Sequence, residues 1–106
     1  MGKADLHGLH IVNFPGATKH FLTGVLAKME SGLHLKQARQ SVFHNHAVKQ
    51  EADIALYAAV ERLDPLSRKP ENTYAKVHPR WEDYTQEETL EIVRGAIKYC
   101  DEQRTQ

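Results

Sequence analysis

Two histidines flank an asparagine in the middle of the chain, as His44, Asn45 and His46. Neutral imidazoles are good zinc ligands, so this pair first suggests a metal site. Zinc needs three or four ligands, however, and no Cys, Asp or Glu stands near the pair at a familiar spacing. His34 or Glu51 would complete such a site only if the fold happened to bring them there. We therefore predict no metal and no other cofactor.

A second chemistry open to the same segment is hydrogen bonding to nucleic-acid bases. Asn45 and Gln50 carry side-chain amides that can make paired hydrogen bonds with adenine, and Lys49 can donate to the acceptors of guanine. Basic residues around them would neutralise phosphates, which positions a protein on DNA without specifying a sequence. The predicted DNA-binding residues are Lys36, Arg39, Asn45, His46, Lys49, Gln50, Arg68 and Lys69.

Catalytic motifs are missing from the sequence. It contains no GxSxG nucleophile motif, no phosphate-binding loop and no dinucleotide-binding glycine pattern. Cys100 falls on the apolar stripe of a predicted helix, which is more typical of a core or interface residue than of a nucleophile. Glu87, Glu88 and Glu91 are typical of a solvated helix face, and their negative charges suit the positive N-terminal end of the helix dipole. We predict that the protein is not an enzyme.

The residues that could contact DNA lie on or between predicted helices. Between Ala17 and Ser31 five large apolar residues share one helical face, and Gly32 is expected to end that helix. A short helix is predicted over 35–42 and a longer one over about 46–63. This is the outline of a helix-turn-helix, whose second helix braces the third and whose third presents its first turns to the major groove.

The rest of the chain predicts an arm and one more helix. Residues 65–82 are basic and contain three of the four prolines, as a loop or arm would. A helix is expected over about 85–104, because Thr85 and Glu88 have capping-box spacing. Its apolar residues repeat close to the spacing of a coiled-coil seam, which predicts a homo-oligomer. The residues of this predicted dimerisation seam are Leu90, Val93, Ile97 and Cys100.

Length and composition favour one small intracellular domain. A chain of 106 residues suits a single domain, so we expect an all-α fold of helix-turn-helix type over 1–106, with its helical core at about 17–63. The lone cysteine fits a reducing compartment. No apolar stretch approaches the roughly 18 residues of a membrane span, and no signal peptide is recognisable. We expect a cytoplasmic protein with no membrane partner.

The charge distribution gives only a weak electrostatic indication of nucleic-acid binding. Net charge is zero, although residues 1–63 carry seven Lys and Arg against five Asp and Glu. Glu51 and Asp53 stand near the start of the proposed reading helix, where phosphates repel carboxylates. Phe43-His44-Asn45 occupies a turn that usually contains a small residue. These features leave open a plain alternative, three packed helices with a solvated polar face.

The segment from about Asp5 to Leu63 resembles the small regulators of fimbrial (adhesin) operons of the PapB type. The similar features are an apolar N-terminal segment, a helix that ends at Gly32, a short basic helix that starts near Lys36, and Asn45 in the turn. The resemblance implies a helical protein that oligomerises and binds DNA near pilus promoters. Plasmid repressors of the KorA type have a comparable layout. The two acidic residues named above depart from the pattern, and the chain from residue 65 onwards has no counterpart.

Two functions from different classes therefore fit the sequence. The first is a small DNA-binding transcriptional regulator whose partner is double-stranded DNA. The alternative is a phage- or plasmid-type interaction module that binds and modulates a host protein, which the zero net charge and the acidic last helix favour. Retention on heparin resin would separate them, because counterion release dominates nucleic-acid affinity.

Overall fold

The protein is all-α in the computed structural model, which describes residues 11–63 and 81–104. This part of the chain contains no strand, so the prediction of a small all-α fold is confirmed. None of its helices is long and apolar enough to cross a bilayer. Most of the predicted arm, with Arg68 and Lys69, lies outside the described residues. The elements are α2 (Pro15–Glu30), α3 (Leu35–Ser41), α4 (His46–Leu63), the 3-10 helix η1 (Trp81–Asp83) and α6 (Gln86–Arg104).

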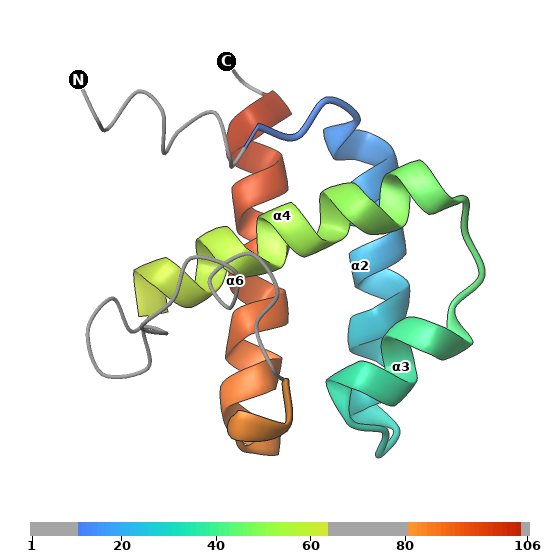
Figure 1. Ribbon diagram of the computed structural model, residues 1–106, viewed down its shortest axis with the longest axis vertical. Coiled ribbons are helices and arrows are strands. Elements are labelled where there is room, and N and C mark those ends of the chain that lie inside the picture. Colours follow the sequence, from blue (N-terminus) through green and yellow to red (C-terminus); the bar gives the residue numbers. More distant parts are fainter. Residues whose placement is uncertain (1–10, 64–80, 105–106) are drawn as a thin grey trace.

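The helices α2 and α6 lie side by side in opposite directions, and α4 crosses both (Figure 1). The side-chain amide of Gln86, at the start of α6, donates to the carbonyl oxygens of Met29 and Leu33 at 3.4 and 3.0 Å. Near the other end of the pair, Lys19 Nζ lies 2.8 Å from Asp101 Oδ1. Polar contacts at both ends thus fix the antiparallel pair on which α4 rests.

The core forms where the apolar faces of α2, α4 and α6 meet. Fully burying one large apolar side chain contributes roughly 1.5–3 kcal/mol, so the stripe on α2 is sufficient reason for that helix to dock. On this stripe Phe21, Leu22, Val25 and Met29 are at most 2% exposed, as the helical spacing predicted. Leu26 lies at the edge of the stripe and is only partly buried.

Small residues let α4 approach α6 closely. Ala52, Ala55 and Ala59 line the inner side of α4, and all three are nearly or completely buried. On α6, a Cβ added at Gly95 would lie 3.2 Å from the Cβ of Ala59. Alanine is the best helix former, and here it also sets the distance between two crossing helices.

The ends of α2 follow local rules. Pro15 occupies the first turn, two residues before the predicted start, because proline needs no N–H partner there. At the other end Gly32 has a φ of +122°. Its N–H donates to Met29 O at 2.9 Å, and Leu33 N–H donates to Lys28 O at 3.2 Å, the two bonds of a Schellman motif. The prediction that Gly32 ends this helix is confirmed.

The start of α6 has the capping box that the sequence predicted. Thr85 Oγ1 accepts the backbone N–H of Glu88 at 3.1 Å, and Glu88 Oε1 accepts the backbone N–H of Thr85 at 2.8 Å. Each side chain therefore satisfies a backbone donor that the first helical turn would leave free. The helix proper begins one residue later, at Gln86.

Candidate nucleic-acid interface

The segment that contains most of the predicted DNA-binding residues folds as a short helix, a turn and a long helix. The helix α3 has 7 residues and α4 has 18, and residues 42–45 connect them. This is the helix-turn-helix order expected from the sequence. The short helix packs mainly against α2, with smaller contacts to α6 and η1. The connection is called the α3–α4 turn below.

The α3–α4 turn is anchored to α2 on its inner side. Val42 has an extended backbone (φ −92°, ψ 119°), and its N–H donates to Ala38 O at 3.2 Å. A Cβ at Gly24 would lie 3.3 Å from Val42 Cγ1, so α2 has a glycine where this side chain passes. The ring of His44 meets the ring of Phe21 edge-on, with centroids 6.0 Å apart. Two residues of the turn are thereby held from inside.

Asn45 caps the start of α4. Its Oδ1 accepts the N–H of Val48 at 2.9 Å, and its own N–H donates to His44 Nδ1 at 2.9 Å. Asparagine is among the preferred residues at this position, because its side chain satisfies a free helix donor. A paired hydrogen bond with adenine needs the same amide oxygen. The predicted base-reading role of Asn45 therefore competes with the cap.

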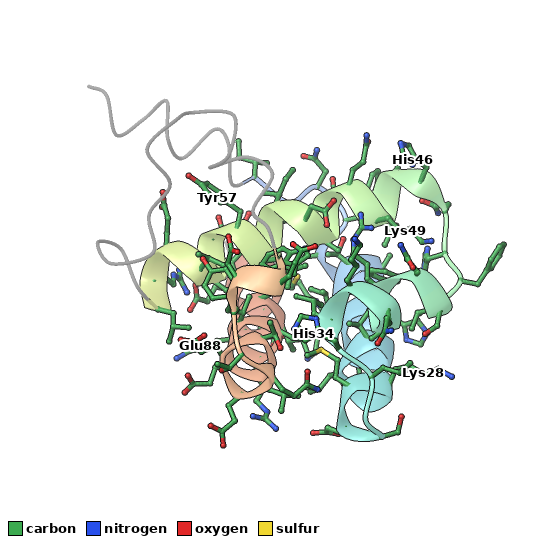
Figure 2. All side chains as sticks on the ribbon, turned by 60° about the horizontal axis from the view of Figure 1, so that its bottom comes forward. Lys28, His34, His46, Lys49, Tyr57 and Glu88 are labelled. Carbon is green, nitrogen blue, oxygen red and sulfur yellow. The ribbon has the colours of Figure 1, made fainter. Side chains whose placement is uncertain are left out.

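Three other predicted contact residues reach the surface on the first turns of α4. His46 and Gln50 are exposed and Lys49 is half-buried, and Figure 2 shows His46 and Lys49 at the same end of α4. An imidazole, an ammonium and an amide on adjacent turns offer the donors and acceptors that base edges match. His46, Lys49 and Gln50 are called the α4 tip below.

Glu51 turns into the protein, away from solvent. Its carboxylate is reached by two backbone donors, Asn13 N–H at 2.9 Å from Oε2 and Phe14 N–H at 2.8 Å from Oε1, and by the Thr18 hydroxyl at 3.4 Å. The carboxylate thus lies at the start of α2, where the helix dipole favours an anion. Glu51 follows the buried Val48 by three residues, a helical spacing that could have indicated its inward position.

Asp53 is engaged by the neighbouring helix α3. Arg39 Nε and Nη2 donate to its two carboxylate oxygens at 2.8 and 2.7 Å, and such a bidentate pair occupies the guanidinium. Arg39 therefore braces α4, and the phosphate contact predicted for it would require breaking this pair. Lys36 is exposed, with Nζ 3.7 Å from Glu82 Oε2, a surface pair of the kind that contributes little.

The segment around the turn has a one-sided charge along the sequence. Residues 31–50 contain no Asp or Glu, and they include three Lys or Arg and three His. The two nearest acidic residues along α4, Glu51 and Asp53, both have protein partners. The sequence argument against phosphate contact at this place treated those two carboxylates as free surface charges, whereas in the structure both are engaged by protein groups.

The predicted dimerisation seam faces the inside of the chain. Val93 and Cys100 are 0% exposed, and Leu90 and Ile97 are partly buried against the same core. Burial is the main reason that the pKa of the Cys100 thiol is raised to about 11. Val93 and Cys100 pack within one chain and are not accessible to a second subunit. The seam as predicted is thus corrected for these two residues, and only Leu90 and Ile97 keep exposed surface.

The histidine pair does not belong to a larger cluster of ligands in the described ranges. Across residues 11–63 and 81–104, no three His, Cys, Asp or Glu side chains come together as a metal site requires. His44 instead contacts Phe21 and accepts the N–H of Asn45.

Comparison with known proteins gives no relative. No protein-family model matches the chain, and no curated protein or solved structure matches it. The resemblance to PapB-type and KorA-type regulators therefore stays a prediction that rests on the residues quoted for it.

Proposed function

We propose that the chain is a small DNA-binding transcriptional regulator of the cytoplasm, with the α4 tip as its reading surface. The observation that carries the proposal is that both carboxylates near the start of α4 are engaged by protein groups, Glu51 by backbone N–H groups and Asp53 by Arg39. The exposed side chains that remain on this part of α4 suit base edges and phosphates.

Each residue of the unit has a distinct role in this proposal. Lys49 donates to the acceptors of guanine and Gln50 pairs with adenine, and each such contact discriminates by about 1–3 kcal/mol. Lys36 neutralises a phosphate, because its weak surface pair with Glu82 is easily replaced. Arg39 acts as a positioning residue that links α3 to α4 through Asp53, and Asn45 keeps the first turn of α4 formed.

A homodimer would let two α4 tips read two half-sites about one helical turn of DNA apart. Leu90 and Ile97 are the members of the predicted seam that keep exposed surface, and they supply only part of such a contact. Sedimentation velocity with and without DNA measures whether the chain pairs, and a monomer in both conditions would contradict this part of the proposal.

The test begins with a randomised duplex pool, from which the unaltered protein enriches its preferred sequence. Fluorescence anisotropy then compares the enriched duplex with a scrambled one at low and near-physiological salt. The double variant Lys49→Ala, Gln50→Ala should lose at least about thirtyfold in affinity for the enriched duplex, since two base contacts are removed. Lys98→Ala is the matched control, because it removes one positive charge from an exposed position on α6.

Three outcomes distinguish DNA binding as such from sequence reading by the α4 tip. Binding that weakens steeply with salt and prefers the enriched duplex supports a regulator. If the unaltered protein binds no duplex even at low salt, DNA is removed as the partner. If the protein binds selectively but the double variant does so equally well, the α4 tip is not the reading surface.

A protein partner is the second candidate. It is favoured by the zero net charge and by exposed apolar side chains, which are Ile11, Phe14, Phe43 and Leu63 in the described residues. An interaction module of this kind should flow through heparin resin and retain one host protein after nuclease treatment. Loss of that protein on nuclease digestion would argue against this candidate.

A further inference from the structure

One large aromatic side chain projects from the α3–α4 turn. Phe43 is 96% exposed, although burial of such a large apolar ring would be favourable. Its neighbours on both sides are fixed, because Val42 packs against Gly24 and His44 packs against Phe21. The ring therefore cannot turn into the core without undoing the turn, and it is presented outward on a held backbone.

The surroundings of this ring indicate what it can contact. Phe43 lies within the acid-free segment 31–50 and three residues before His46, the first residue of the α4 tip. At about 3.8 Å between successive Cα atoms, the ring stands within roughly one groove width of the tip. Phe43 is therefore close enough along the chain to reach the groove that the α4 tip is proposed to enter. The apolar group that this groove offers is the 5-methyl of thymine, a recognised partner of phenylalanine.

We propose that Phe43 is a specificity-determining residue that packs against the 5-methyl group of a thymine in the major groove. The inference rests on the proposed function and adds a base contact that hydrogen bonding does not supply. It explains why the turn has a large aromatic residue where a small one is usual. The preferred DNA sequence should then contain a thymine beside the bases that Lys49 and Gln50 contact.

The experiment removes the methyl group from the DNA and the ring from the protein, separately and together. The enriched duplex is synthesised with thymine or with uracil at each thymine position, and both are titrated with the unaltered protein and with Phe43→Ala. The unaltered protein should bind the uracil duplex about fourfold more weakly at the contacted position, the effect of one buried methyl-sized group. Phe43→Ala should bind the thymine duplex more weakly and no longer distinguish thymine from uracil there.

Two further variants control for general effects. Leu63→Ala removes an apolar side chain that is 43% exposed at the opposite end of α4, and it should keep the discrimination between thymine and uracil. Phe43→Leu should keep part of it, because an aliphatic group still meets the methyl. Urea unfolding of Phe43→Ala should give the same midpoint as that of the unaltered protein, as for other exposed positions.

Several results would overturn the inference. If Phe43→Ala still distinguishes thymine from uracil, another residue contacts the methyl group, while the proposed function stands. If the unaltered protein binds the uracil duplex equally well at every position, no methyl group is contacted, and again only this inference fails. If the unaltered protein enriches no duplex, both proposals fail together. A host protein whose retention needs Phe43, in the absence of any DNA binding, would assign the ring to a protein surface instead.

Discussion

Replacing Glu51 by glutamine tests whether the buried carboxylate holds the start of α2 to α4. In the structure two backbone N–H groups, of Asn13 and Phe14, share the two carboxylate oxygens at 2.9 and 2.8 Å. Glutamine has nearly the same shape but only one oxygen. Its amide nitrogen is a donor, so one of the two N–H groups loses its acceptor at this part-buried site.

The expected loss follows from these contacts. A buried donor left without an acceptor costs about 1–3 kcal/mol, which is an upper range for these part-buried N–H groups. Removing the negative charge from the start of a helix costs about 0.3–1 kcal/mol more. We therefore expect Glu51→Gln to lower the free energy of unfolding by about 2–3 kcal/mol, a large part of the stability of a domain of this size.

Urea unfolding followed by far-UV circular dichroism and by Trp81 fluorescence measures this loss. With a slope of about 1–2 kcal/mol per molar urea, the midpoint should fall by roughly 1–3 M. Hydrogen exchange at the amides of Asn13 and Phe14 should also accelerate, because their acceptor has been weakened locally.

The matched control is Glu91→Gln, which removes the same charge from an exposed position on α6. It should change the free energy of unfolding by no more than about 0.5 kcal/mol. The reasoning is refuted if Glu51→Gln is equally harmless, since the carboxylate would then not hold the two N–H groups in solution.

Two further predictions concern packing and pH. Gly95→Ala should destabilise the fold by about 1 kcal/mol in thermal unfolding, because the new Cβ would lie 3.2 Å from the Cβ of Ala59 on another helix. The control Gly16→Ala meets no atom within 4 Å and should be neutral or slightly stabilising. Equal effects of the two substitutions on stability would contradict the close crossing of α4 and α6. Burial is the first cause that raises the pKa of Cys100 from 9.0 to about 11 and that of Tyr57 from 10.0 to about 12. The stability that these protonated groups contribute is complete below about pH 9 and is lost as the pH rises through their folded pKa values. The urea midpoint should therefore fall over this pH range, and it should fall less in Cys100→Ala and Tyr57→Phe. If the midpoint of both variants falls with pH as steeply as that of the unaltered protein, these groups are not the cause.

Features that depend on neighbours along the chain could be predicted from the sequence. The apolar stripe of α2 follows from helical periodicity, Gly32 ends that helix because it accepts a positive φ, and the pairing of Thr85 with Glu88 follows from their spacing. In each case the interacting groups lie within one or two turns of each other, so local geometry suffices.

Features that depend on distant partners could not be predicted in this way. Glu51 looked like a surface charge that would repel phosphate, whereas its partner Asn13 lies 38 residues away. The stripe of α6 looked like a contact between subunits, because periodicity shows that a face is apolar but not which surface covers it. In the structure Val93 and Cys100 on that face are buried within the same chain, where α6 packs against α2 and α4.

The antiparallel pairing of α2 with α6 has a consequence for the order in which the protein can fold during synthesis. These two helices make the most extensive contact in the described structure, yet they stand at opposite ends of it. The ribosome releases α2, α3 and α4 before α6, and until then their apolar faces have no complete cover. Closing so long a loop slows folding relative to a bundle of sequential neighbours. The core between α2 and α4 is therefore complete only when the last helix has emerged, and a chain truncated before α6 should be more readily cleaved by proteases.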